Sequence, residues 1–94
     1  MQYEWDEEKN RANVAKHGIA FEAVRAFDWS TAVSDIDDRE DYGELRETAT
    51  GFIGLTLYYL VYVVEDDDPE TMRVISLRAA NKAEARRYAN ERRE

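Results

Sequence analysis

The fold is decided by the stretch LYYLVYVV at residues 57–64, which is rich in aromatic and β-branched side chains. Such side chains favour a pleated strand, along which successive residues point to opposite faces. Both faces of this stretch are apolar, as is typical of a strand that is covered on both sides. We therefore expect residues 57–64 to form the central strand of a sheet.

Further strand patterns lie on either side of this stretch. Residues 31–36 alternate between two faces, and residues 45–55 form a second strand. Residues 65–70, with the only proline, predict a turn that leads into a last strand at residues 72–77. Because these connections are too short for crossovers, the sequence predicts an antiparallel meander of about four strands.

Helices are predicted at both ends of the chain. Asp6 is a good N-cap for a first helix, which ends at Gly18, and residues 19–27 predict a second, shorter helix. Asn81 and Glu84 form a capping-box pattern at the start of a final helix. An extended segment or short strand precedes the first helix.

The length of 94 residues fits one domain, which we place at residues 1–94. The order of elements predicts an α+β fold with two N-terminal helices, a meander sheet and one C-terminal helix. We expect the helices to cover one face of that sheet.

Composition excludes several chemistries. The chain has no cysteine, which removes disulfides, thiolate zinc sites and a cysteine nucleophile. It shows neither a glycine-rich phosphate loop nor a metal-ligand spacing, so we expect no metal and no cofactor. The first residues are polar rather than signal-like, and no apolar run reaches about 18 residues. We expect a cytoplasmic protein that does not contact a membrane.

The net charge of −8 is unevenly distributed. Residues 73–94 hold seven basic and three acidic residues, a net +4, so the rest of the chain carries −12. A basic end can contact a phosphate backbone locally, although the negative charge of the whole chain repels nucleic acid as it approaches. The alternative is that these charges simply solvate a terminal helix.

One candidate site lies on the first predicted helix. Lys9, Asn13, Lys16 and His17 share a face there, because their spacing matches the helical period. Two cations, an amide and the only imidazole suit binding of a phosphate or a carboxylate. The alternative is a solvated face, with His17 interacting with the helix dipole.

A second candidate site is Arg73 with Arg78, around the last strand. Arg73 interrupts an apolar pattern, so it must reach solvent, pair with an acid or face a cleft. The odd separation places the two arginines on opposite faces of a regular strand, unless the chain bends near Leu77. The alternative for Arg73 is a structural pair with an acid such as Glu47.

Three segments together resemble a known family. They are EWD at 4–6 with KHGI at 16–19, Glu44 and Arg46 leading to Ile53-Gly54, and MRVIS at 72–76 followed by Arg78-Ala79. In this order and spacing they resemble the BrnT family of RelE-like ribonuclease toxins, over nearly the whole chain.

The resemblance implies a RelE-like fold and RNA cleavage without metal, in which the 2′-hydroxyl attacks the neighbouring phosphate and translation is inhibited. It implies a partner, a BrnA-like ribbon-helix-helix antitoxin that neutralises the toxin and through which alone DNA is contacted. It also implies catalytic roles for Arg73 and Arg78 as cations and for His17 in proton transfer. The implied RNA contacts are Lys9, Lys16, Arg46 and Lys82.

The chain also departs from the family pattern. Ala79 stands where members commonly have a second arginine, and the acidic net charge weakens attraction to phosphate. The alternative function is therefore a catalytically silent homologue that binds an antitoxin-like partner. Tyr58, Tyr59 and Tyr62 would contribute an exposed aromatic surface to that interface. A purely structural domain would leave the recurring cations unexplained.

Overall fold

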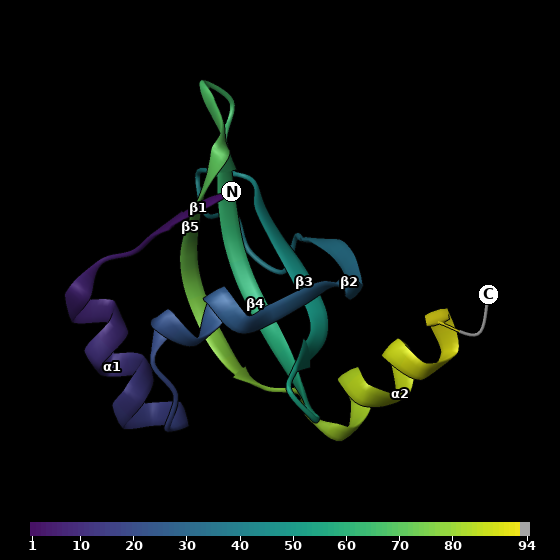
Figure 1. The fold of residues 1–94 in the computed structure, drawn as a ribbon. Helices are drawn as coiled ribbons and strands as arrows, with labels where there is room; N and C mark the ends of the chain where they lie inside the picture. The colour runs from purple at the N-terminus through teal and green to yellow at the C-terminus, as the bar shows by residue number, and fades with distance from the viewer. Residues whose placement is uncertain (93–94) are drawn as a thin grey trace.

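The computed structural model describes residues 1–92 and shows a curved, mixed sheet with helices around it (Figure 1). The elements are β1 (Gln2–Glu4), α1 (Glu7–His17), the 3₁₀ helix η1 (Phe21–Ala26), β2 (Phe27–Asp37), β3 (Arg46–Ile53), β4 (Thr56–Glu65), β5 (Asp68–Ala79) and α2 (Lys82–Arg92). The strand order in the sheet is β1-β5-β4-β3-β2. Arg93 and Glu94, part of the basic end, lie outside the described residues.

The predicted α+β class and the central position of β4 are confirmed. Strands β2 to β5 form the expected antiparallel meander. The prediction of four strands was incomplete, because β1 adds a fifth strand that pairs in parallel with β5, from Gln2 opposite Thr71 to Glu4 opposite Arg73. Three residues are too few to show a strand period, and this pairing spans most of the chain.

The second, shorter helix predicted at residues 19–27 is present, but it is a 3₁₀ helix and is shorter than predicted. The chain forms the short 3₁₀ helix η1, and β2 already begins at Phe27. A 3₁₀ helix has 3.0 residues per turn, so Phe21, Val24 and Phe27 line up on one side, and all three are buried. Ala20 gives this helix no side-chain cap, which helps to explain why it stays short. The predicted turn at 65–70 was also too long, because Pro69 already lies in β5.

The main core lies between η1 and one face of the sheet. Phe21 and Val24 pack there in one cluster with Leu60, Tyr62 and Met72, all of which are buried. Tyr62 was expected on an exposed aromatic surface, but its ring meets Trp29 edge-on at 5.6 Å between centroids. The described part of the core is therefore aromatic and aliphatic.

The helices do not all cover one face, so this prediction was wrong. Helix α2 lies over the face opposite η1, where the Tyr88 ring meets Phe52 edge-on at 5.9 Å. The Tyr88 hydroxyl donates a hydrogen bond of 2.5 Å to the carbonyl of Thr31. None of the described α2 residues is fully buried, so α2 is attached by a few side chains rather than by a core. No helix within residues 1–92 is long and apolar enough to cross a membrane.

Helix α1 begins and ends as predicted. Asp6 accepts hydrogen bonds from the backbone of Glu8 and Lys9, and Gly18 takes the left-handed conformation (φ 75°) that favours glycine. The helix is joined to the outer edge of β5 by the buried Asn13 side chain. Its Nδ2 donates to the Leu77 carbonyl at 2.8 Å, and its Oδ1 accepts from the Leu77 amide at 3.3 Å. Asn13 therefore acts as a substitute strand partner for β5.

Gly51 allows β2 to bulge against β3. The pairing of β2 with β3 shifts between Asp28 and Val33, where the chain folds over Gly51. A Cβ at Gly51 would lie 2.8 Å from Cζ of Phe27 and 3.3 Å from the backbone of Ala32. Only glycine fits this position without displacing the core, and the same bulge presents the Thr31 carbonyl to α2.

Candidate active site

A bulge in β5 places Arg73 and Arg78 on the same face of the sheet. Val74 pairs with Tyr62 and Ser76 pairs with Val61, so Ile75 is an extra residue on β5. One inserted residue reverses the alternation of side chains beyond it. The two arginines, which an odd separation would place on opposite faces, therefore face the same way.

The arginines lie at two positions along this face rather than side by side. In the register of the two strands, Arg73 lies opposite Val63 and Arg78 lies opposite Tyr59 on β4. These partners are four residues apart, which corresponds to about 13 Å along a strand. A shared site required an irregularity in the strand near Leu77. The strand is irregular, but the bulge lies at Ile75.

Arg78 is held rigidly in place. Its two terminal nitrogens donate to the two carboxylate oxygens of Glu84 at 2.7 Å each, and its guanidinium lies 4.6 Å from the centre of the Tyr59 ring. Glu84 also accepts from the Asn81 amide, which confirms the predicted capping box. Burial raises the pKa of Glu84, but the hydrogen bonds from Arg78 and Asn81 outweigh it, so the pKa lies below its ordinary value.

Arg73 forms the other end of the face. It donates to Glu44 at 2.6 Å and more weakly to Glu65 at 3.4 Å. Arg73 thus pairs with an acid, as the alternative interpretation predicted, but the acid is Glu44. Glu47, the acid given as an example, lies opposite Tyr62 in the strand register and so points to the core face. The hydrogen bond from Arg73 is the largest influence that lowers the pKa of Glu44.

Arg46 belongs to the same end, since it shares Glu44 with Arg73. Its Nε lies 3.4 Å from Glu44, and its guanidinium lies 4.0 Å from the centre of the Tyr42 ring. Arg46 is therefore paired with an acid as well as being an implied RNA contact.

Sequence reasoning missed Arg39, which also lines this face. It makes a two-point ion pair with Asp37, whose carboxylate is almost fully buried. Arg39 also lines a pocket with Tyr59 and Glu84. Nothing in the acidic segment at residues 35–44 distinguished this arginine. The position of Arg39 depends on the conformation of the loop between β2 and β3, which places its side chain against the sheet beside Thr48 and Tyr59.

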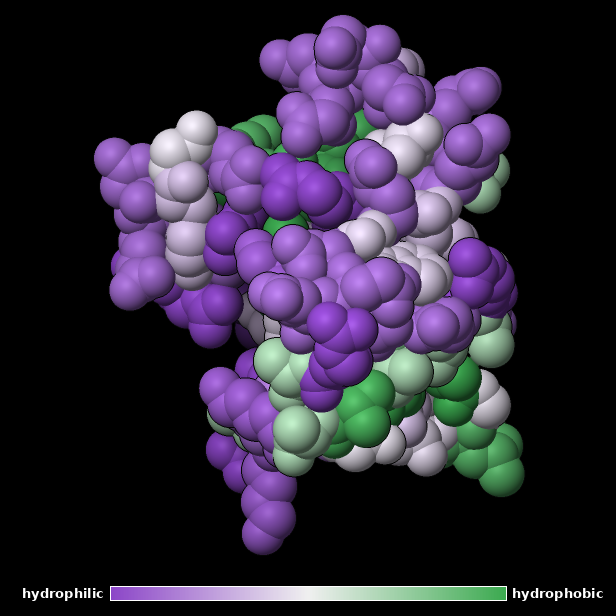
Figure 2. All heavy atoms as spheres, turned by 90° about the vertical axis from the view of Figure 1, so that its left-hand side faces the viewer, coloured by the Kyte–Doolittle hydropathy of each residue, from purple (hydrophilic) through white to green (hydrophobic). Residues whose placement is uncertain are grey.

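The four candidate residues on α1 lie at one cleft. Lys9 and Lys16 are exposed and His17 is half-buried, and all three line a small cleft of about 220 Å³ against Ile75 and Ser76. Asn13 faces the same cleft but is buried and bonded to β5 as described, so its amide is not a free ligand group. Figure 2 shows that the surface on the α1 side of the molecule is mostly hydrophilic.

The charge of Arg78 also influences His17. Burial, together with the charges of Lys16 and Arg78, holds the pKa of His17 below its ordinary value. A lowered pKa leaves the imidazole neutral near pH 7 and able to accept a proton. Lys82 is exposed at the start of α2 and lines neither of the two clefts described here, so the structure does not bring it to the other site residues.

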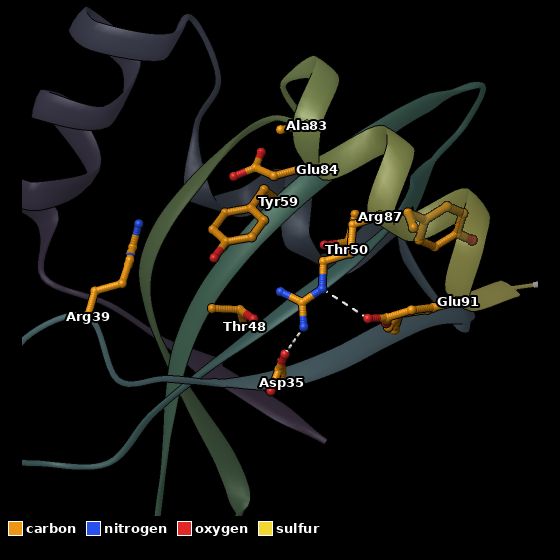
Figure 3. A pocket seen from close by; sticks show the side chains of 11 residues that line it. Asp35, Arg39, Thr48, Thr50, Tyr59, Ala83, Glu84, Arg87 and Glu91 are labelled. Carbon is orange, nitrogen blue, oxygen red and sulfur yellow. Dashed lines mark hydrogen bonds and ion pairs between the residues drawn. The ribbon is translucent and has the colours of Figure 1, made fainter.

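An open pocket of about 290 Å³ lies between the arginine-bearing face and α2 (Figure 3). Thr48, Thr50 and Tyr59 form its floor. Arg87 reaches across it from α2 and pairs with Asp35 on β2. Arg87 also donates to Glu91 on its own helix at 2.9 Å, so α2 closes one side of the pocket through charged side chains.

Comparisons with known proteins identify the family to which this α+β domain belongs. Residues 5–84 match the model of the family described as "Ribonuclease toxin, BrnT, of type II toxin-antitoxin system", which defines the class as a toxin of such a system. Since the match covers most of the chain, the protein belongs to the BrnT family. Membership of a type II system implies an antitoxin partner.

A solved structure gives independent support for the fold. The chain is similar to the 1.1 Å crystal structure of the Brucella abortus ribonuclease toxin BrnT, with a TM-score of 0.64 and 27% sequence identity. The similarity covers 87% of this chain and 99% of that chain. No curated protein sequence matches the chain.

Proposed function

We propose that this chain is an active ribonuclease that cleaves RNA without a metal ion. The 2′-oxygen forms a bond to the adjacent phosphorus while the bond from phosphorus to the 5′-oxygen breaks. The proton leaves the 2′-hydroxyl for a base, and the 5′-oxygen receives a proton. The observation that carries the proposal is the β5 bulge, which places Arg73 and Arg78 on one face.

Arg78 is the cation best placed to stabilise the charge that develops on the phosphate. Its ion pair with Glu84 and its contact with Tyr59 fix the guanidinium before RNA binds. Preorganised donors of this kind stabilise a transition state without reorganisation during the reaction. Glu84 occupies only some of the five guanidinium donors, so others stay free for a phosphate oxygen. Arg73 and Arg46 would hold the RNA backbone further along the face.

His17 is the proposed proton-transfer group, and Lys9, Lys16 and Lys82 are the proposed RNA contacts on the exposed surface. The charge of Arg78 helps to keep the imidazole of His17 neutral. We further propose that a BrnA-like ribbon-helix-helix protein neutralises this toxin, that DNA is contacted only through it, and that cleavage inhibits translation in the cytoplasm. A RelE-like origin of the fold stays a prediction.

The pH dependence of cleavage tests the role of His17. Because its pKa lies below the ordinary value of 6.5, the base form is already dominant at neutral pH. We expect kcat/KM for a short RNA to rise with pH along a limb whose midpoint lies below about 6.5. In His17→Gln this limb should disappear and the rate should fall by about 10²- to 10⁴-fold. A midpoint above 6.5, or an unchanged limb in the variant, would contradict the role.

Cleavage by the purified chain in the presence of a metal chelator tests the proposed function itself. We expect fragments that carry a 2′,3′-cyclic phosphate and a 5′-hydroxyl, together with growth arrest and RNA loss on induced expression. Coexpression with a ribbon-helix-helix antitoxin should restore growth. Intact RNA and normal growth at verified expression would refute the proposal.

A second function, as a silent antitoxin-binding module, is favoured by one feature of the site. The arginines at this face already have carboxylate partners: Arg78 with Glu84, Arg73 with Glu44 and Arg39 with Asp37. Such pairs lower the attraction for phosphate. This function predicts tight antitoxin binding by a chain that cleaves no RNA, so the same two assays separate the alternatives.

A further inference from the structure

We propose that the pocket between the sheet and α2 binds a nucleobase that carries an exocyclic amino group, next to the phosphate that is cleaved. The inference rests on the proposed function for its ligand, RNA. It adds a base-recognition site to the cation site, by which we mean the Arg78 guanidinium and the residues that hold it.

The pocket has the size and the walls for a base. Its volume of about 290 Å³ is near the lower end of the range of about 300–1,000 Å³ for ligand sites. The sheet supplies Thr48, Thr50 and Tyr59, while α2 supplies Glu84 and Tyr88. A flat, aromatic-lined space that is open on one side suits one ring system better than a bulky side chain.

Tyr59 provides a stacking surface. The side chain is half-buried on the central strand β4 and lines the pocket. Arg78 lies 4.6 Å from the ring centre, which adds a planar cation to the aromatic surface. Proteins that bind single-stranded RNA commonly stack unpaired bases on tyrosine rings and guanidinium planes.

The polar lining favours amino-bearing bases over uracil. Asp35, Glu84 and Glu91 place three carboxylates around the pocket, beside the hydroxyls of Thr48 and Thr50. Arg87 and Arg78 already donate to these carboxylates, but an ionised carboxylate has about four acceptor sites, so acceptor sites remain for a base. Carboxylates only accept hydrogen bonds, and guanine, adenine and cytosine each offer an amino group as donor. Uracil has no amino group and offers these carboxylates only one ring N–H, between two carbonyl acceptors. Figure 3 shows Arg87 extended between Asp35 and Glu91, where its plane limits the opening.

The pocket is continuous with the cation site. Glu84 and Tyr59 line the pocket and are the same two residues that hold Arg78. A base that stacks on Tyr59 therefore has its own phosphate within reach of the Arg78 guanidinium. The pocket would thus select which base flanks the cleaved bond.

Nucleotide binding without turnover tests the inference directly. The ¹⁵N-labelled wild-type chain is titrated with the 3′-monophosphates of the four nucleosides and with inorganic phosphate, none of which is a substrate. We expect chemical-shift changes at Thr48, Thr50 and Tyr59 with the guanine, adenine or cytosine nucleotides, and at least about tenfold weaker binding of the uracil nucleotide. Phosphate alone should leave these pocket signals unchanged.

A pair of variants separates stacking from folding. Tyr59→Leu should weaken binding of the favoured nucleotide by about 5- to 150-fold, whereas Tyr59→Phe keeps the ring and should bind as the wild type does. Native-like spectra of both variants confirm that each one folds. Equal binding of all four nucleotides, or equal effects of both variants, would overturn the inference.

The outcomes also distinguish this inference from the proposed function. RNA cleavage without nucleotide-induced shifts in the pocket would refute the base site and leave the ribonuclease intact. Pocket shifts in a chain that cleaves no RNA would refute the ribonuclease and support the base site. Shifts caused only by an antitoxin peptide would identify the pocket as a protein-binding site and overturn the inference.

Discussion

Arg78→Ala should reduce RNA cleavage by about 10²- to 10³-fold, the typical cost of removing one preorganised donor from a charge-stabilising site. Expression of the variant should no longer arrest growth. The reason is that Arg78 is fixed by Glu84 and Tyr59 on the face it shares with Arg73. The measurement is kcat/KM on a short RNA, with growth and total RNA followed in parallel.

Two further variants make this result specific. Arg86→Ala removes an exposed arginine of α2 that does not line the pocket, so its cleavage rate should match the wild type. Arg78→Lys keeps the charge but loses the two-point pair with Glu84, so we expect an intermediate rate. The melting temperature of each variant shows whether it folds. A well-folded Arg78→Ala chain with full activity would remove Arg78 from the site.

Asn13→Ala should produce a large loss of stability. The substitution leaves three backbone groups without the partner they have now: the Leu77 amide, the Leu77 carbonyl and the Ile19 carbonyl. Each unpaired buried group costs about 1–3 kcal/mol, so we expect a total loss of about 3 kcal/mol. For a domain of this size that lowers the melting temperature by roughly 12–24 °C.

The matched control is Asn90→Ala, in which the same side chain is removed from an exposed position on α2. Its effect should stay within about 0.5 kcal/mol. Thermal unfolding followed by circular dichroism measures both variants. If Asn13→Ala unfolds at the temperature of Asn90→Ala, the side chain of Asn13 is not what holds α1 to the edge of β5.

The sequence predicted the features that depend on nearby residues. The apolar stretch at residues 57–64 identified the central strand, and Asp6, Gly18 and the Asn81–Glu84 pair identified three helix ends. These signals are local, because a cap or a strand period involves side chains only a few positions apart. The ordered family segments likewise identified the BrnT family, which the match over residues 5–84 confirms.

Other features depended on residues that are distant along the chain. The parallel pairing of β1 with β5 joins residues that lie about 70 positions apart, and no local period signals it. Asn13 shares a helix face with Lys9 and Lys16, but contact with Leu77 turns it into a structural group. Glu44 rather than Glu47 pairs with Arg73, because strand register decides which acid shares its face.

The sequence by itself determined the α+β class, the family and the set of candidate cations. Only the tertiary structure decided which of those cations lie on the same face of the sheet. The insertion of Ile75 between Val74 and Ser76 has no signature in the amino-acid pattern, since a bulge is defined by how two strands pair. That single extra residue reverses the side-chain alternation and brings Arg73 and Arg78 to one face. Whether two residues share a site is a property of strand pairing, which the separation of the residues in sequence cannot determine.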